Sequence, residues 1–255
     1  MIDLAVITGG GSGIGKAIAL KLGSLNVPVL LVGRASSCTQ TQNEITAKGG
    51  RAEVLSCDLE NHSQIKAELP ARLGKYSSKK IGLLLAASIL DTPNCENTSL
   101  DLEKVFRTNV VGNLAVLESC LPTLLKLKFS RVIFFAGGGA AYANPEFPAY
   151  SLSKVSTVRL VENLAASYPP TTGLSFVCLA PGAVATPMLA KVIAAGAEVK
   201  TKTAIEEPIE FAVSFFESSS PALTGRYVHV RDDWKAYLDG SKIVNKEQLY
   251  LRRIQ

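Results

Sequence analysis

The stretch that decides the fold is Thr8-Gly-Gly-Gly-Ser-Gly-Ile-Gly15, which follows the apolar run Leu4–Ile7. The run predicts a strand, and a helical pattern opens at the end of the quoted stretch. Gly9, Gly13 and Gly15 stand in a T-G-x-x-x-G-x-G spacing between the two elements. Glycine permits a tight turn, a close approach of the backbone to a ligand and close packing of a helix on a strand. The pattern therefore predicts the strand, turn and helix that begin a β-α-β unit.

The rest of the chain alternates between short apolar runs and longer amphipathic segments. The runs that predict strands are Leu4–Ile7, Val27–Val32, Ala52–Ser56, Ile81–Ala87, Arg131–Ala136, Leu174–Leu179 and a weaker Gly225–Val230. The segments that predict helices are Gly13–Ser24, Ser36–Lys48, His62–Tyr76, Ser99–Leu127, Ala149–Ser167 and Glu206–Glu217. Several apolar runs are continuous, as is typical of parallel strands covered on both faces. We therefore predict an α/β fold, a single-domain Rossmann-type doubly wound parallel sheet of about seven strands flanked by helices, over residues 1–255.

Two regions depart from the alternation. Pro187–Thr203 has a helical pattern without a strand partner, and we expect either a lid inserted over a substrate cleft or a plain surface helix. The tail, residues 231–255, is largely polar. We expect the tail to serve packing or oligomer contacts rather than chemistry.

Composition excludes several classes of partner. The 27 basic and 22 acidic residues give a net charge of +5 without a basic block, so nucleic acid is not an expected partner. The apolar runs are shorter than the roughly 20 residues of a membrane span. No charged segment precedes the first strand, which disfavours a signal peptide and predicts a cytoplasmic protein.

Cysteine and histidine usage disfavours a disulfide framework and a metal site. The five cysteines are far apart and include no C-x-x-C pair, so buried thiols in a reducing compartment are expected. They are Cys38, Cys57, Cys95, Cys120 and Cys178. His62 and His229 have no metal-ligand spacing. We therefore predict no metal.

The glycine turn predicts a dinucleotide site. Its helix offers unpaired N–H groups and a partial positive charge to phosphates. The second strand ends at Arg34, where NAD binders carry an acidic side chain for the ribose 2′-hydroxyl. A guanidinium pairs instead with a 2′-phosphate, which favours NADP(H), with NAD(H) as the alternative. Asp58 follows the third strand and either accepts a hydrogen bond from the adenine amino group or caps the next helix.

Tyr150 and Lys154 are the candidate catalytic pair. Their spacing places both side chains on one face of a helix. A free phenol titrates near ~10, and a nearby ammonium favours the phenolate. The pair can therefore act as a general acid or base in an alcohol–carbonyl interconversion. A solvated pair on a helix surface is the alternative.

With these motifs in this order, and with Pro181-Gly-Ala-Val-Ala-Thr186, the chain resembles the short-chain dehydrogenase/reductase superfamily over residues 2–230. The resemblance implies an oxidoreductase that moves a hydride between a nicotinamide and a small-molecule carbonyl or alcohol. It implies that Tyr150 exchanges the proton, that Lys154 binds the nicotinamide ribose and lowers the Tyr150 pKa, and that Asn109 holds a relay water. It also implies a homodimer or homotetramer. Motifs and resemblance together give these cofactor-binding candidates: Thr8, Gly9, Ser12, Gly13, Ile14, Gly15, Arg34, Asp58, Leu59, Ala86, Ala87, Tyr150, Lys154, Pro181, Gly182, Val184 and Thr186.

Two departures from the family pattern bear on activity. Ala86-Ala87-Ser88 stands where the family has N-A-G, so an Asn that braces the sheet is missing. Gly137 stands where the family has a Ser that hydrogen-bonds the substrate oxygen. Removing such a donor from an enzyme costs about 10²–10³ in rate.

Three interpretations of the empty serine position follow. Another donor substitutes, either Tyr142 or a backbone N–H of Gly137–Gly139. Alternatively, the enzyme is slow or acts on an unusual substrate. In the third, the protein is a catalytically weak or inactive NADP(H)-binding sensor or scaffold. A related sugar-nucleotide epimerase or dehydratase is disfavoured because the chain lacks a sizeable C-terminal substrate domain.

Overall fold

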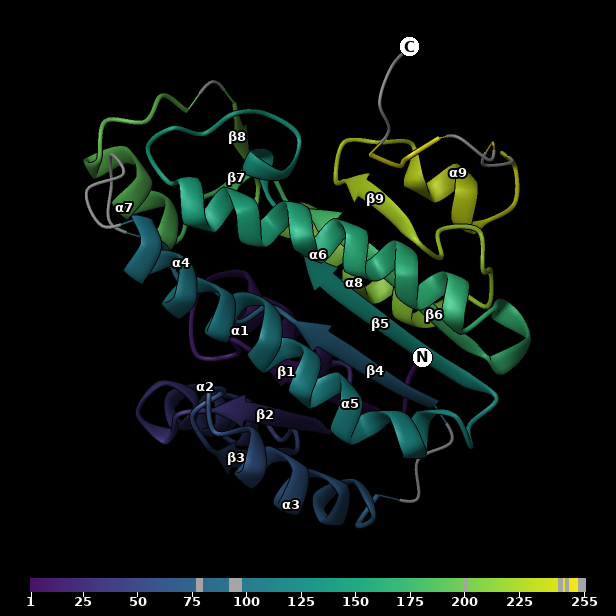
Figure 1. Cartoon of the computed structure of the whole chain (residues 1–255). Helices are drawn as coiled ribbons and strands as arrows, with labels where there is room; N and C mark the ends of the chain where they lie inside the picture. Colours follow the sequence, from purple (N-terminus) through teal and green to yellow (C-terminus); the bar gives the residue numbers. More distant parts are fainter. Residues whose placement is uncertain (77–79, 92–97, 200, 243–244, 246–247, 252–255) are drawn as a thin grey trace.

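Seven parallel strands form the central sheet of the computed structural model, in the spatial order β3-β2-β1-β4-β5-β6-β9 (Figure 1). The structure describes residues 1–76, 80–91, 98–199, 201–242, 245 and 248–251. The strands are β1 Leu4–Thr8, β2 Val29–Gly33, β3 Ala52–Ser56, β4 Lys80–Leu85, β5 Phe129–Phe135, β6 Leu174–Ala180 and β9 Arg226–His229. Strand β1 pairs with β2 on one side and with β4 on the other, so the strand order reverses there. This confirms the predicted doubly wound sheet. Sheets of this kind usually bind ligands outside the carboxyl ends of the strands, where the strand order reverses.

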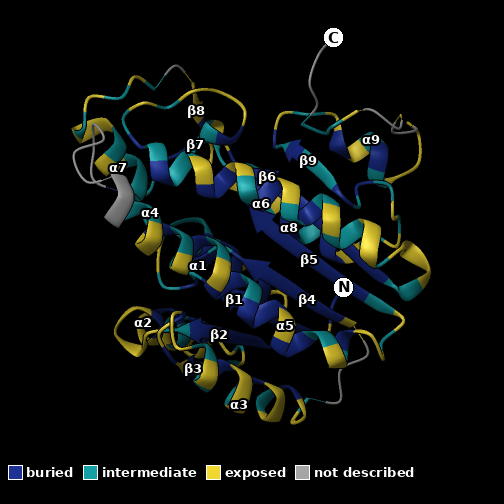
Figure 2. Cartoon of the chain, viewed as in Figure 1, coloured by how far each residue is buried: buried dark blue, intermediate teal, exposed yellow. Residues whose placement is uncertain are grey.

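Helices cover both faces of the sheet, and their apolar sides form two core clusters (Figures 1 and 2). One cluster lies under α3 His62–Leu73, α5 Asn113–Leu124 and α6 Pro148–Ser167. The other lies under α1 Gly13–Ser24, α2 Ala35–Ala47, α8 Glu206–Glu217 and α9 Trp234–Leu238. Figure 2 shows the inner strands largely buried and the exposed helix residues on the outer side, whereas the edge strands β3 and β9 are only partly buried. Burial on both faces explains why the strand sequences are continuously apolar.

The predicted helix Ser99–Leu127 is interrupted in the structure. Helix α4 Thr98–Phe106 passes into a π-helical turn at Arg107–Gly112, and α5 follows directly. A π-helical turn is rare and often occurs at functional sites, because it turns side chains and carbonyls away from the regular ladder. Here the turn contains Asn109, whose side chain is buried.

The segment Pro187–Thr203 differs from the expectation. It contains α7 Pro187–Ala194 and the short strand β8 Lys202–Thr203, which pairs with β7 Ala183–Val184 in a separate two-stranded sheet. The expected lack of a strand partner is therefore wrong. Two-residue strands carry too little apolar sequence to be recognised from a pattern.

The beginning of the tail is part of the core. Trp234 and Tyr237 of α9 are buried, and the indole ring meets the Phe211 ring edge-on with the centroids 5.1 Å apart. This agrees with a packing role for this part of the tail. Residues 252–255 lie outside the described ranges.

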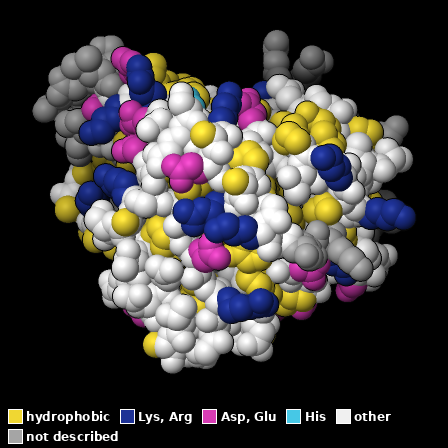
Figure 3. Space-filling view, turned by 90° about the horizontal axis from the view of Figure 1, so that it is seen from below, with side chains coloured by type: hydrophobic (Ala, Val, Ile, Leu, Met, Phe, Trp, Pro, Cys, Tyr) yellow, Lys and Arg dark blue, Asp and Glu magenta, His cyan; other side chains and the backbone are white. Residues whose placement is uncertain are grey.

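The helices, the surface charges and the cysteines bear on which partners the protein is expected to have. None of the helices in the described ranges is long and apolar enough to cross a membrane. On the face in Figure 3, Lys and Arg side chains lie in small groups among acidic and neutral ones. The cysteines with a described environment, Cys38, Cys57, Cys120 and Cys178, are buried free thiols, and Cys95 lies outside the described residues. No group of three or more metal-ligating side chains occurs in the described part of the chain.

Candidate active site

The glycine turn connects β1 to α1 and packs against Ala86, the residue that follows β4. Gly9 and Gly13 have φ angles of 67° and 54°, in the left-handed region that favours glycine. A Cβ on Gly9 would lie 2.7 Å from the backbone carbon of Ala86, and one on Gly15 would lie 2.4 Å from the carbonyl oxygen of Gly9. The absence of side chains therefore allows β4 and the start of α1 to press against the turn, which leaves a backbone-lined cradle at the start of the helix.

Asn113, which the sequence analysis missed, holds the ends of β1 and β4 together. The Thr8 hydroxyl donates to Asn113 Oδ1 at 2.6 Å and accepts from Ala87 N at 3.1 Å. Asn113 Nδ2 donates to the carbonyl oxygens of Ala87 and Asn109, each at 2.9 Å. The Asn expected near Ala86 is absent, and a different Asn braces the same two strands from α5. The only sequence signal is the helical spacing of Asn109 and Asn113.

We expect Asn113→Ala to lower the free energy of unfolding by about 2–3 kcal/mol, because it leaves buried polar groups of Thr8 and Ala87 without partners. Denaturant unfolding measures the change. Asn43→Ala, at an exposed position of α2, is the matched control and should change stability by less than about 0.5 kcal/mol. Equal unfolding midpoints for the two variants would show that water replaces the Asn113 amide.

Asn109 connects the loop after β4 to α6, the helix with the candidate catalytic pair. Its Oδ1 accepts from Ile89 N at 2.8 Å, and its Nδ2 donates to Ile89 O at 3.0 Å and to Ser153 Oγ at 3.1 Å. Ser153 Oγ in turn donates to the Tyr150 carbonyl at 2.6 Å. Both hydrogens of the Asn109 amide are therefore used by the protein. A relay water at Asn109 would therefore have to donate a hydrogen bond to an oxygen of this residue.

Tyr150 and Lys154 lie together on α6, as their spacing predicts. Lys154 Nζ lies 5.2 Å from the centre of the Tyr150 ring and donates to the Phe135 carbonyl at 3.1 Å. Burial lowers the pKa of Lys154 to about 8 and raises the pKa of Tyr150 to about 12. In the protein alone, burial therefore outweighs any lowering of the Tyr150 pKa by Lys154. The lowering expected from the family resemblance remains a prediction for the complex with cofactor and substrate.

The empty serine position lies beside this pair. A Cβ on Gly137 would lie 3.1 Å from Tyr150 Oη. Tyr142, one of the two expected substitutes, is 80% exposed. The carbonyl oxygen of Gly137 accepts a hydrogen bond from the hydroxyl of Tyr227 at 3.2 Å. Tyr227 lies in β9 and had no motif that indicated a site.

Asp91 fixes the start of α6. Its two carboxylate oxygens accept hydrogen bonds from Ala149 N at 2.8 Å and from Tyr150 N at 3.1 Å. The carboxylate is buried and faces the positive end of the α6 dipole. Asp91 has no signal in the sequence, because its partners are distant in the chain and no local capping pattern marks it.

The candidates for the adenine end lie at the neighbouring strands β2 and β3. Arg34 is exposed at the N-terminus of α2, and Asp58 is exposed after β3. Asp58 Oδ1 accepts only a local bond from Glu60 N, at 3.0 Å, whereas Asn61 caps α3. Asp58 is therefore not the cap of the next helix. The Leu59 side chain is buried in the core, so it is not exposed for contact with a ligand.

The segment after β6 meets the glycine turn from the opposite side. A Cβ on Gly13 would lie 3.3 Å from Thr186 Cγ2, and Thr186 Oγ1 caps α7 by accepting from Leu189 N at 3.2 Å. Gly182 has a φ of 72°, and Val184 is buried in β7. The candidates that follow β1, β4, β5 and β6 thus meet at one edge of the sheet.

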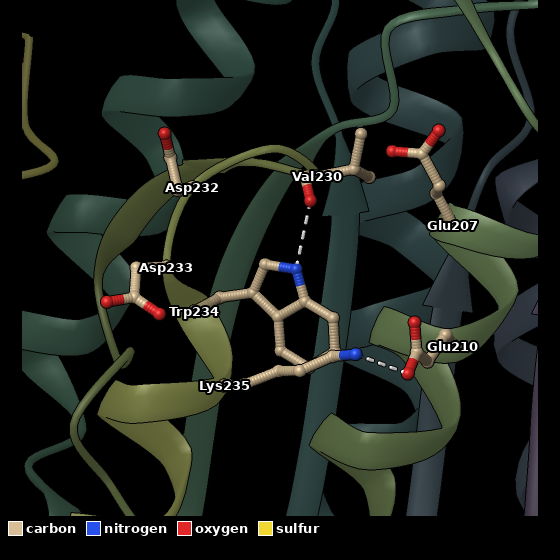
Figure 4. A pocket seen from close by; sticks show the side chains of 7 residues that line it. All are labelled: Glu207, Glu210, Val230, Asp232, Asp233, Trp234 and Lys235. Carbon is tan, nitrogen blue, oxygen red and sulfur yellow. Dashed lines mark hydrogen bonds and ion pairs between the residues drawn. The ribbon is translucent and has the colours of Figure 1, made fainter. Parts of the chain in front are cut away.

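A surface hollow beside α8 and α9 includes none of these candidates (Figure 4). Its carboxylates are engaged locally: Glu210 pairs with Lys235 at 2.5 Å, and Asp232 accepts from His229 N at 2.7 Å. Trp234 Nε1 donates to the Val230 carbonyl at 3.0 Å. The hollow is therefore a seam between packed elements and does not contribute to the candidate site.

Comparisons with known proteins identify the family. A family model described as short chain dehydrogenase matches residues 3–196, so the chain belongs to the short-chain dehydrogenase family. A short chain dehydrogenase of Pseudocercospora fijiensis is 27% identical, over 98% of this chain and 88% of its own. An NADPH-dependent aldehyde reductase-like protein of Arabidopsis thaliana, described as chloroplastic, is 29% identical over 72% of this chain and 73% of its own.

A solved structure supports the same assignment. A Beutenbergia cavernae protein, provisionally described as an NAD(P) dependent gluconate 5-dehydrogenase and solved with NADP at low occupancy, superposes with a TM-score of 0.80. The two chains are 25% identical, and the match covers 91% of this chain and 96% of the other. Fold and family therefore agree with the resemblance that the motifs indicated.

Proposed function

We propose that this chain is an NADP(H)-dependent oxidoreductase that moves a hydride between a nicotinamide and a carbonyl or alcohol carbon of a small molecule. One observation carries the proposal: Tyr150, with Lys154 near its ring, lies beside Gly137 at the same sheet edge as the glycine turn, and Thr186 approaches that turn at Gly13. The NADPH-dependent and NADP-bound relatives support it. Two further parts of the proposal are that α7 covers the substrate and that the protein is a homodimer or homotetramer.

The residues present fit a dinucleotide. The cradle at Gly9, Gly13 and Gly15 has no room for side chains, and unpaired N–H groups at the start of α1 suit a pyrophosphate. Arg34, exposed at the end of β2, suits a 2′-phosphate. Bound NADP(H) supplies or accepts the hydride at the nicotinamide ring.

The protein's own part in the reaction is the movement of a proton. In reduction, Tyr150 Oη gives its proton to the oxygen of the carbonyl group as the carbon receives the hydride; in oxidation, the phenolate takes that proton back. Lys154 is held by the Phe135 carbonyl near the phenol ring, where its charge stabilises the phenolate. Asp91 and Ser153 fix the turn of α6 that carries Tyr150.

A second candidate function is an NADP(H)-binding sensor without turnover. The observation that favours it is Gly137, which offers no hydroxyl beside Tyr150 Oη. The test follows NADPH oxidation against ketones, aldehydes and keto-sugars, with NADPH binding measured on the same preparation by calorimetry. Turnover of any of these substrates supports the oxidoreductase, whereas binding without turnover supports the sensor.

We expect Arg34→Ala to weaken NADPH binding by about 10-fold or more and to leave NADH binding nearly unchanged, because it removes a charge-assisted pair with the 2′-phosphate. Arg51→Ala is the matched control, since Arg51 is also exposed but precedes β3 at the opposite edge of the sheet. Dissociation constants for both cofactors measure the effect. An equal loss for NADPH and NADH, or a loss in the control, would contradict the assigned role.

A further inference from the structure

Two phenols, from different elements, approach the empty serine position. Tyr150 Oη, from α6, would lie 3.1 Å from a Cβ on Gly137. Tyr227 Oη, from β9, lies 3.2 Å from the Gly137 carbonyl oxygen. Figure 1 shows β9 beside the part of the sheet that α6 crosses. The backbone of the residue that stands at the serine position is thus contacted by a second hydroxyl, supplied from a distant part of the sequence.

We propose that the Tyr227 hydroxyl replaces the missing serine and donates a hydrogen bond to the substrate oxygen while Tyr150 exchanges the proton. This inference rests on the proposed oxidoreductase function and names the residue that completes its site. No bond other than a hydrogen bond is exchanged at Tyr227.

The hydrogen bonds at Gly137 allow the Tyr227 proton to change partner. The Gly137 carbonyl also accepts from Ala140 N, at 2.9 Å, which is shorter than its bond from Tyr227. When the phenol turns to a substrate oxygen, the carbonyl keeps this backbone partner. The change of partner therefore leaves no buried polar group unsatisfied. An unsatisfied buried group is the cost that usually prevents such an exchange.

Packing holds Tyr227 on rigid elements. It is half-buried against the core cluster beneath α6, opposite Cys178 in the register of β6 and β9. Its backbone N–H donates to the Leu249 carbonyl at 2.8 Å. A donor on a strand is placed more accurately than one on a loop. Tyr142, the other tyrosine near Gly137, is 80% exposed and lacks this support.

The electrostatic surroundings suit a donor. Burial raises the pKa of Tyr227, and the acidic groups Cys178, Tyr142, Asp232 and Tyr150 raise it further. The phenol therefore keeps its proton at neutral pH. Lys154 lies against Tyr150, so the two phenols have different surroundings and different tasks.

The test compares Tyr227→Phe with Tyr76→Phe in the full-length protein. Tyr76 is half-buried on the same core cluster, and burial also raises its pKa, so this control removes a comparable hydroxyl far from Gly137. We expect Tyr227→Phe to lower kcat by about 10²-fold with the best substrate of the panel, the cost of a lost donor to a developing oxyanion. NADPH binding and the unfolding midpoint should match those of Tyr76→Phe, and that control should keep its activity.

A rescue variant separates a missing donor from general damage. Gly137 is in extended backbone, with a φ of −175°, that a serine can adopt. We expect Gly137→Ser to raise the activity of Tyr227→Phe by about 10-fold or more, because it restores a donor. Recovery of activity in the double variant supports the inference, because a serine at position 137 would not restore a purely structural role of Tyr227.

The outcomes that overturn the inference are distinct. If Tyr227→Phe keeps its turnover, or if Tyr142→Phe causes the loss instead, Tyr227 is not the donor although the proposed function stands. A large gain from Gly137→Ser alone would show that nothing had replaced the serine. If the protein binds NADPH and turns over none of the substrates, the proposed function fails, and this inference fails with it.

Discussion

Tyr150→Phe is expected to lower kcat by about 10³-fold while the dissociation constant for NADPH stays within about 2-fold, since a general acid or base contributes roughly 10²–10⁴ in rate. The reason is local. The phenol lies at the sheet edge beside Gly137, and Lys154 is its nearby cation. Phenylalanine keeps the ring and its packing against the Lys154 side chain, so the helix that carries the pair should not move. Single-turnover absorbance of NADPH measures the hydride step directly.

Tyr168→Phe is the matched control for this experiment. Tyr168 ends the same helix, and its ring packs on Phe176 with the centroids 6.1 Å apart, away from the edge that carries the candidate site. Its loss should leave kcat and the apparent KM for the carbonyl substrate unchanged. If Tyr150→Phe retained turnover, another group would be the proton donor. An equal loss of NADPH binding would indicate a role in binding alone.

Most of the sheet could be predicted because its inner strands are buried on both faces. Ala52–Ser56 was predicted with the bounds that the structure has, as were the helices Gly13–Ser24 and Glu206–Glu217. The predicted start of the second strand was two residues early, since the strand begins at Val29, after Pro28. Proline has no N–H to give to a ladder.

The parts that were missed depend on contacts between distant residues. The π-helical turn contains Asn109, whose amide bonds to Ile89 and Ser153, and no local pattern of residues encodes that pairing. Asp91 caps a helix to which it has no sequence relation. Tyr227 looked like an ordinary strand residue. Glycine and Tyr-x-x-x-Lys spacings, by contrast, are local and could be found in the sequence alone.

These missed residues form one connected support for the candidate site. Asn113 ties the ends of β1 and β4 to the carbonyl of Asn109. The Asn109 side chain reaches Ser153, which bonds to the carbonyl of Tyr150. The glycine turn and the catalytic helix are thereby joined through buried hydrogen bonds. A change at the turn should consequently affect both cofactor binding and the placement of the phenol.

Gly9→Ala is therefore expected to have the largest effect on binding and stability together. A side chain there must adopt a φ of 67° and would also meet the backbone carbon of Ala86 at 2.7 Å. The left-handed conformation costs roughly 1–2 kcal/mol, and overpacking a filled site costs roughly 1–3 kcal/mol more. We expect the free energy of unfolding to fall by about 2–5 kcal/mol, the sum of these two costs, and NADPH binding to fall below detection.

Gly49→Ala separates the two causes. Gly49 has a φ of 82°, but a Cβ there would have no atom within 4 Å. This control carries the conformational cost alone, so it should lose about 1–2 kcal/mol and keep full NADPH affinity. Chemical unfolding and calorimetric titration of both variants give the comparison. If Gly9→Ala lost no more stability and NADPH affinity than Gly49→Ala, the close contact between the turn and the end of β4 would contribute nothing to stability or binding. The shape of the cradle would then not depend on that contact.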